Sequence, residues 1–241
     1  MLTPEELLNY NVFPDQQQAW NYITAAYGRF VQTSMLAGME EVQRAFEFGA
    51  NPYFLTLILE DDLPGVQLDL ANWFGRLENS PEIEKRTQVA GEKAFDFLHF
   101  NAEDPQAAAW TLLKDSGYDL VLFCEILEHM LVDPAPCMRN IHDMLRPDGR
   151  LVLTTPNVFW KRNKQSWDQG RNIYEWYSPH GPHGRHNRIW ASYEIQQAAP
   201  TWGFAVETLY TGAVSHGDWA ARREDPRMED GEGIFAVLRR L

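Results

Sequence analysis

The sequence has few cysteines and no long hydrophobic run. Cys124 and Cys137 are the only cysteines among 241 residues, which excludes a disulfide scaffold and a zinc site built from four cysteines. No stretch approaches the roughly 20 apolar residues that a membrane-spanning helix needs. Residues 1–11 lack the basic start and apolar run of a secretory signal. We therefore expect a cytoplasmic protein, since free cysteines suit a reducing compartment.

Positive charge is also scarce. The chain has 21 Lys and Arg residues against 34 Asp and Glu residues, so its formal net charge is −13. Proteins that bind nucleic acid usually carry a basic surface, and here only a local one could form, from Lys161, Arg162, Lys164 and Arg171. We expect a small-molecule or carrier-bound substrate, and the charge disfavours nucleic acid as a partner. The oligomeric state is left open.

Short apolar runs alternate with helical patterns along the middle of the chain. This order is typical of an α/β fold, a mostly parallel sheet with helices on both faces. Strands are predicted at 44–48, 66–70, 94–100, 119–123, 151–155, 204–210 and 234–239. Helices are predicted at 53–59, 80–90, 106–114, 134–145 and 192–200. Residues 1–42 read as a helical N-terminal cap, so the main domain is expected to span residues 43–241.

Polar residues stand where these strands end, and ligands of open α/β sheets bind at the carboxyl ends of the strands. The first strand ends at Glu47 and turns at Gly49, where the following helix offers free N–H groups. Asn72 ends the second strand, at the distance where nucleotide-binding sheets bind ribose hydroxyls. The third ends at Asn101-Ala102, an amide beside a backbone N–H that suits an adenine edge. Each signal is weak alone, because Asn and Gly are common in ordinary turns.

The segment after the fourth strand carries Glu125, Glu128 and His129. If this segment is a helical turn, the three residues lie at i, i+3 and i+4 and face one side. Two carboxylates and an imidazole form a candidate divalent-metal site or acid–base cluster. In the alternative interpretation, His129 merely packs under the next helix and Glu128 binds backbone N–H groups.

The strongest stretch is 118–157, YDLVLFCEILEHMLVDPAPCMRNIHDMLRPDGRLVLTTPN. A strand ends in Glu-x-x-Glu-His, a helix follows, then Leu-Arg-Pro-Asp-Gly and a strand ending in Thr-Pro-Asn. This order resembles class I S-adenosylmethionine (SAM)-dependent methyltransferases, and the resemblance extends over roughly residues 43–239. It implies a Rossmann-like seven-stranded sheet, mostly parallel, with the last strand antiparallel.

The resemblance also implies the cofactor site. Glu47, Gly49, Ala50 and Asn51 fall on the loop that holds the methionine part of SAM. Asn72 falls on the ribose ligand, Asn101 and Ala102 on the pair that binds adenine, and Cys124 and Glu125 beside the methyl donor. The chain departs from the family pattern, since only Gly49 remains of several glycines and Asn72 replaces an acid. A non-catalytic binding subunit with this fold is therefore an alternative.

The motif is nearest to O-methyltransferases with a Glu-x-x-Glu-His stretch, including enzymes of the ubiquinone pathway. The expected reaction is methylation of a hydroxyl of a small or medium substrate, with His129, Glu125 and His186 as the catalytic residues. His129 is the first choice as the base. Metal-dependent RNA 2′-O-methyltransferases resemble the same stretch. They imply Mg²⁺ or Mn²⁺ on Glu125, Glu128, His129 and His186, and make RNA methylation a second alternative.

Residues 158–190 form a long aromatic-rich connection after the fifth strand. Long connections in compact domains are usually functional or disordered, and the many aromatic residues argue against disorder. We predict substrate contacts from Asn157, Trp160, Tyr174 and Trp176. The alternative is that the aromatic side chains only pin the loop to the surface. Tyr22 or Tyr27 of the N-terminal cap could close the site.

Overall fold

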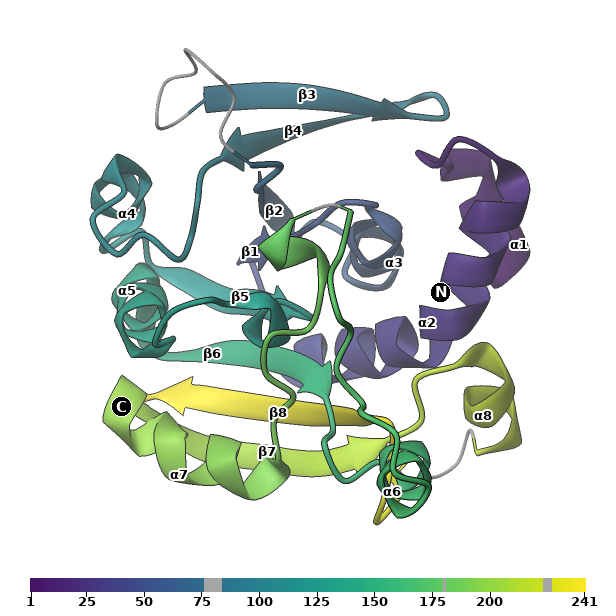
Figure 1. Ribbon diagram of the computed structural model, residues 1–241. Coiled ribbons are helices and arrows are strands. Elements are labelled where there is room, and N and C mark those ends of the chain that lie inside the picture. The colour runs from purple at the N-terminus through teal and green to yellow at the C-terminus, as the bar shows by residue number, and fades with distance from the viewer. Residues whose placement is uncertain (76–83, 180, 223–226) are drawn as a thin grey trace.

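The computed structural model describes residues 1–75, 84–179, 181–222 and 227–241. Within these residues one sheet has eight strands in the order β3-β4-β2-β1-β5-β6-β8-β7 (Figure 1). The strands are β1 (Arg44–Phe48), β2 (Gln67–Asn72), β3 (Glu84–Ala90), β4 (Lys93–His99), β5 (Tyr118–Cys124), β6 (Leu145–Pro156), β7 (Phe204–Gly212) and β8 (Gly233–Arg240). Strands β4, β2, β1, β5 and β6 pair in parallel, and β8 runs antiparallel to β6 and β7. The predicted α/β fold with an antiparallel last strand is confirmed.

Two predictions about the edge of the sheet are wrong. The sheet has eight strands instead of seven, because the helix expected over 80–90 is replaced by strand β3 from Glu84 onward; residues 80–83 lie outside the described residues. Side chains of β3 alternate between half-buried and exposed, and Thr87 and Val89 are the β-branched residues that favour strands. Gly91, with φ +63°, turns the chain back so that β3 pairs antiparallel with β4.

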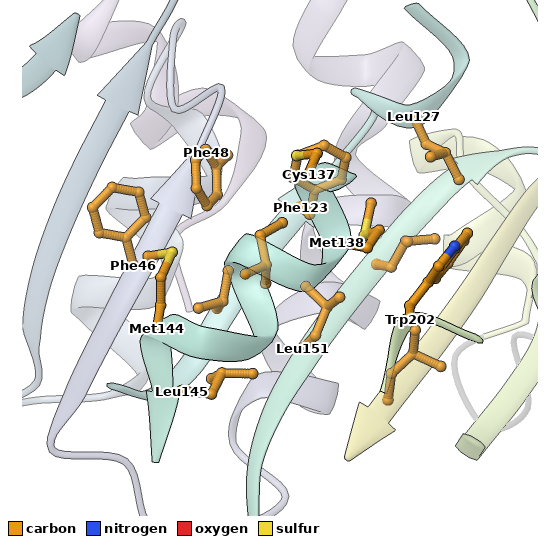
Figure 2. Close-up of a cluster of buried hydrophobic side chains, with 14 of the residues drawn as sticks. Phe46, Phe48, Phe123, Leu127, Cys137, Met138, Met144, Leu145, Leu151 and Trp202 are labelled. Carbon is orange, nitrogen blue, oxygen red and sulfur yellow. The ribbon is translucent and has the colours of Figure 1, made fainter. Parts of the chain in front are cut away.

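Helices cover both faces of the sheet (Figure 1). One face carries α4 (Ala108–Leu113), α5 (Ala135–Met144) and α7 (Ser192–Trp202), and the other carries α2 (Gln16–Ala37), α3 (Phe54–Asp62) and α8 (His216–Ala221). Each layer has its own apolar core. In the first core, Met138 of α5 lies near Leu151 of β6 and Trp202 of α7, and Met144 lies near Phe46 of β1 (Figure 2). The sheet is therefore a rigid platform whose strand ends are fixed relative to one another.

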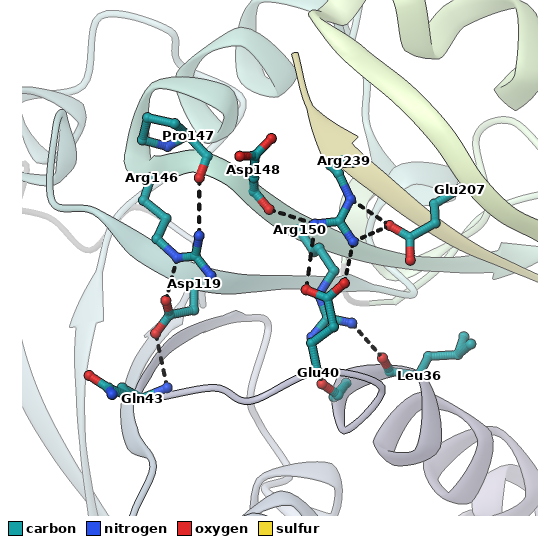
Figure 3. A network of polar contacts seen from close by, with 11 residues as sticks. Leu36, Glu40, Gln43, Asp119, Arg146, Pro147, Asp148, Arg150, Glu207 and Arg239 are labelled. Carbon is teal, nitrogen blue, oxygen red and sulfur yellow. Dashed lines mark hydrogen bonds and ion pairs between the residues drawn. The ribbon is translucent and has the colours of Figure 1, made fainter.

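The N-terminal region is helical, as predicted, in α1 (Pro4–Leu7), the 3₁₀ turn η1 (Leu8–Tyr10) and α2. Thr3 and Glu6 form a capping box for α1, and Asp15 caps α2. The buried guanidinium of Arg150 donates to the carbonyls of Leu36 and Ala37, at the end of α2 (Figure 3). These bonds satisfy carbonyls that a helix leaves free, so they attach the end of α2 to β6.

The aromatic connection 158–190 has some regular structure of its own. It contains α6 (Lys161–Asp168) and a 3₁₀ turn, η3 (Pro182–Gly184). A further 3₁₀ turn, η2 (Leu127–His129), follows β5. Among the described residues, no helix is both long and apolar enough to cross a membrane.

Candidate active site

A cleft of about 680 Å³ opens at the carboxyl ends of β1, β2, β4 and β5. A smaller pocket adjoins it, and the two share Phe48, Gly49 and Glu125. The predicted cofactor residues Gly49, Asn72, Asn101, Ala102 and Glu125 line the cleft. The remaining four, Glu47, Ala50, Asn51 and Cys124, line the smaller pocket. The structure therefore brings all nine residues together, because parallel strands end at one edge of the sheet.

Gly49 makes the turn that joins the two cavities. Its φ of +67° belongs to the left-handed region that glycine adopts without steric cost. A Cβ at this position would lie 3.1 Å from the side chain of Ile126, and the Gly49 N–H donates to the Ala71 carbonyl at 2.8 Å. The backbone at Gly49 is thus fixed against β2 on one side and against Ile126 on the other.

Asn72, predicted as the ribose ligand, holds this loop through its side chain. Its Oδ1 accepts from the Asn51 N–H at 2.8 Å, and its Nδ2 donates to the Tyr53 hydroxyl at 3.2 Å. Gln88 on β3 accepts from both Asn51 and Tyr53. Sequence analysis missed Tyr53 and Gln88, and Gln88 lay in the segment predicted as a helix. Contact of Asn72 with ribose stays a prediction.

Asn101 and Ala102 end the run that follows β4, in the wall of the cleft. The Asn101 Oδ1 accepts from the Glu103 N–H at 3.0 Å, which fixes the turn. Glu103 in turn lies 2.7 Å from Nε2 of His183. His183 also lines the cleft, so the aromatic connection reaches the cofactor side of the site through a residue that sequence analysis did not select.

Three of the ionisable residues that line the smaller pocket are buried. Glu47 is buried and accepts a hydrogen bond from Thr56 at 2.7 Å, and burial raises the pKa of this carboxyl to about 7. Burial also raises the pKa of the Cys124 thiol to about 12, so this cysteine is not a nucleophile. The third group is Arg29 of α2, whose Nε lies 3.9 Å from a Glu125 oxygen.

Sequence analysis did not select Arg29. The sequence feature that could have pointed to Arg29 is a single charged residue within the apolar stretch Tyr27–Val31. The side chain is only 8% exposed. Tyr22, one of the residues expected to close the site, lines the same pocket, whereas the Tyr27 hydroxyl donates to the Leu2 carbonyl.

The acid–base cluster lies at the end of β5. Ligand atoms of Glu128, His129 and His186 all lie within 4.8 Å of one another, among the residues that the structure describes. Glu125, the fourth member of the predicted metal set, lies apart from them and accepts from Thr154 at 3.0 Å. The reason is local: Glu125 has a φ of +55° and only Leu127–His129 is helical, so the expected single helical turn is not formed.

His129 has a defined orientation. Its Nδ1 lies 2.9 Å from the Arg185 carbonyl, which fixes the proton on Nδ1 and leaves Nε2 as the acceptor. Burial lowers the pKa of His129, with the charge of His186 acting in the same direction. Burial and then the Glu125 charge raise the pKa of Glu128 well above its usual range. His129 therefore stays neutral at neutral pH, at the wall of the cleft.

None of the four predicted substrate residues is among those that line the cleft. Asn157 is buried, its Nδ2 donates to the Gly231 carbonyl and its Oδ1 accepts from the Phe159 N–H, so its side chain holds the end of β6. Trp160 precedes α6 and lies under the Arg162 guanidinium. Tyr174 accepts from the Ile189 N–H, and Trp176 is 85% exposed. Their contact with a substrate stays a prediction.

The chain matches the family model of a methyltransferase domain over residues 45–209. No curated protein sequence matches it. Among solved structures, a SAM-dependent methyltransferase from Thermotoga maritima is 10% identical with a TM-score of 0.59, and the match covers 93% of this chain and 95% of that chain. One from Mesorhizobium loti is 13% identical with a TM-score of 0.54, covering 88% and 98%.

A third similar structure is a proposed methyltransferase in complex with the Trm112 methyltransferase activator, from Haloferax volcanii. It is 17% identical with a TM-score of 0.56, and the match covers 91% of this chain and 92% of that chain. Identities this low show the shared fold alone. The family match spans more than half of the chain and includes the strand ends that form the cleft. The chain therefore belongs to the methyltransferase domain family and is a SAM-dependent methyltransferase.

Proposed function

We propose that this enzyme methylates a hydroxyl oxygen of a small or medium-sized substrate, with His129 as the base. The observation that carries the proposal is the geometry of His129. Its Nδ1 is held by the Arg185 carbonyl, and its Nε2 is left to accept a proton at the wall of the cleft. A neutral imidazole is the form that a general base needs, and burial favours that form here.

The residues of the cleft fit SAM. The elongated cofactor needs a polar end for its amino-acid part and a flatter end for adenine. The smaller pocket provides Glu47, Glu125 and Arg29 for the first, and Asn101 and Phe100 line the cleft at the second. SAM would supply a methyl group on a positively charged sulfur. The chain would hold donor and acceptor in line, and orientation of this kind contributes about 7–11 kcal/mol to such displacements.

In the proposed reaction, the substrate hydroxyl lies near His129 Nε2 and transfers its proton there as the methyl group arrives. The Arg185 carbonyl then stabilises the imidazolium through Nδ1–H. Glu128 Oε1 lies 3.7 Å from the same Nε2. Its role would be electrostatic, since its oxygen is beyond hydrogen-bond distance. His186 stacks edge-on against His129, with ring centroids 5.0 Å apart, and would limit the movement of the ring.

A second candidate is metal-assisted transfer at the same cluster. Glu128 Oε1 is buried and has no hydrogen-bond partner in the described residues, and it lies within 4.8 Å of ligand atoms from His129 and His186. A carboxylate and two imidazoles are suitable ligands for Mn²⁺, and less so for Mg²⁺, which prefers oxygen. A bound ion would lower the pKa of the substrate hydroxyl. In this version His129 is a ligand and not the base.

The acceptor atom and the substrate class are part of the proposal. The net charge of −13 favours a small or carrier-bound substrate over RNA. RNA 2′-O-methylation remains an alternative because the Glu-x-x-Glu-His stretch resembles enzymes with that activity.

The test is a screen of hydroxylated compounds with labelled SAM, followed by kinetics of variants. We expect His129→Asn to lower kcat by a factor of about 10²–10⁴ without changing the affinity for S-adenosylhomocysteine. His142→Asn is the matched control, because His142 pairs with Asp143 on α5, outside the cleft. Undiminished kcat in His129→Asn would refute the base. The metal-assisted version predicts that a chelator abolishes the activity of the wild type and that added Mn²⁺ restores it. Added Mn²⁺ should not restore activity in Glu128→Gln. These results together would establish the metal-assisted version.

A further inference from the structure

Arg29 is a buried cation outside the part of the chain that the family model matches. Within the described residues its Nε has no hydrogen-bond partner, although the atom is buried. The Tyr22 side chain forms a hydrogen bond with the guanidinium, but it does not pair with Nε, and a buried N–H donor left unpaired away from water is costly. The nearest opposite charge, Glu125, lies 3.9 Å from Nε, which is an ion pair without a hydrogen bond. Arg29 therefore has an Nε–H donor that no described residue satisfies.

The position of Arg29 is fixed by the packing of α2. Its backbone N–H donates to the Val214 carbonyl at 3.0 Å. The preceding residue, Gly28, lies so close to Ser215 and Trp219 that a Cβ there would meet atoms at 2.8 Å. Helix α2 therefore lies directly against α8 and the segment before it. Arg29, the residue after Gly28, places its guanidinium at the wall of the smaller pocket.

The pocket that Arg29 lines contains charges of both signs. Glu47 and Glu125 are its carboxyl groups, and Arg29 is its only guanidinium among the lining residues. Gly49 and Ala50 contribute only small side chains to its lining, next to aromatic residues such as Tyr22 and Phe54. A pocket with one cation and adjacent carboxyls complements a zwitterion, whose carboxylate and ammonium are a few ångströms apart. The amino-acid end of SAM is such a group, whereas its adenosine end carries neither charge.

We propose that Arg29 binds the α-carboxylate of the methionine part of SAM. The planar fork of an arginine matches a carboxylate through two parallel N–H···O bonds. Arg29 is thus a cofactor-positioning residue, which the N-terminal helix contributes to a site otherwise built from strand ends. The inference rests on SAM as the cofactor of the family and does not depend on which substrate atom accepts the methyl group. Its test is therefore separate from the test of O-methylation.

A purely structural role for Arg29 predicts a different result. If Arg29 only balances Glu125, its removal would destabilise the fold or weaken every ligand of the cleft alike. If Arg29 binds the carboxylate, its removal weakens only ligands that carry this group. A comparison between ligands therefore separates the two roles within each variant.

The experiment is calorimetric titration of the whole chain with two ligands. One is S-adenosylhomocysteine, and the other is its decarboxylated analogue, which keeps the ammonium and the adenosine. We expect Arg29→Met to lower the affinity for S-adenosylhomocysteine by about 10- to 100-fold, the range for a hydrogen bond to a charged group. The affinity for the analogue should change less than about threefold. In the wild type, S-adenosylhomocysteine should bind more tightly than the analogue.

Two further variants keep the test decisive. Arg29→Lys retains the charge and should recover part of the lost affinity for S-adenosylhomocysteine; it also carries the comparison if Arg29→Met does not fold. Arg188→Met, which removes an exposed arginine paired with Glu194, is the control and should bind both ligands like the wild type. Equal losses for the two ligands, or no loss for S-adenosylhomocysteine, would overturn the proposal. Thermal unfolding of each variant confirms that the protein titrated is folded.

Discussion

Replacing Glu47 by glutamine should change how the stability of the protein depends on pH. The carboxyl lies at the end of β1, buried, with one hydrogen bond from Thr56. Burial raises the pKa of Glu47 from an ordinary 4.5 to about 7. Glutamine has nearly the same shape and can still accept from Thr56, but it cannot ionise. The substitution therefore removes the titration and leaves most of the packing.

The sign and size of this pH dependence follow from the pKa of Glu47 in the folded and the unfolded chain. Between pH 4.5 and pH 7 the unfolded chain releases a proton that the folded chain retains, so stability falls as pH rises through this window. The full loss is about 3 kcal/mol, since each pKa unit is worth about 1.4 kcal/mol. About 2 kcal/mol of it should appear between roughly pH 5.5 and 8, a range that avoids precipitation near the isoelectric point.

The assay is urea unfolding of the wild type and Glu47→Gln at several pH values in that range. The free energy of unfolding of the variant should rise relative to that of the wild type by about 2 kcal/mol from the acid to the alkaline end. Glu92→Gln, on the exposed turn between β3 and β4, controls for the loss of one negative charge. A difference between the wild type and Glu47→Gln that does not vary with pH would refute the reasoning.

Three further substitutions test the loop, the hairpin and the helix anchor. Gly49→Ala should lower the free energy of unfolding by about 1–2 kcal/mol because the φ at this position is positive. The loss should exceed that of Gly170→Ala, a position with a similar φ of +69° but no atom within 4 Å of an added Cβ. Urea unfolding measures both losses. Gln88→Leu should weaken S-adenosylhomocysteine binding by up to about 30-fold in calorimetry, because Asn51 and Tyr53 each lose a hydrogen bond worth about 1 kcal/mol. An unchanged affinity would contradict a role for β3. Arg150→Met should lower the free energy of unfolding by about 1–3 kcal/mol, since the Ala37 carbonyl loses its Arg150 donor and the Leu36 carbonyl loses one donor but keeps the Met39 N–H. Arg239 is more exposed, so Arg239→Met should cost less than about 1 kcal/mol. Equal losses in denaturant unfolding would show that burial of Arg150 does not matter.

The strand ends were predictable because each strand has a clear local pattern in the sequence. An apolar run followed by Glu47-Phe48-Gly49, or by Cys124-Glu125, has few other interpretations, and parallel pairing then collects the ends at one edge. The helix predicted over 80–90 was wrong because Ser80-Pro81-Glu82 resembles a helix start. The alternating β-branched residues Thr87 and Val89 were the signal for a strand. Pairing with β4 stabilises the strand over the helix.

The site was predictable only where it depends on the sheet. Arg29 lines the smaller pocket, and Gln88 accepts hydrogen bonds from Asn51 and Tyr53 beside it. Nothing in the local sequence of either residue reveals these contacts. Glu125 was expected to face His129, but the left-handed backbone at Glu125 directs it to Thr154 instead. Such a reversal depends on a single residue's dihedral angle, which composition and spacing do not determine.

The most direct test of the account is calorimetric titration of the purified chain with S-adenosylhomocysteine. The cleft at the strand ends predicts saturable binding of one ligand per chain in the micromolar range, weakened in Gly49→Ala. Binding at this strength would support Gly49, Asn72 and Asn101 as parts of a working cofactor site despite the missing glycines. Absence of binding to a folded sample would contradict the central claim that this cleft holds the methyl donor.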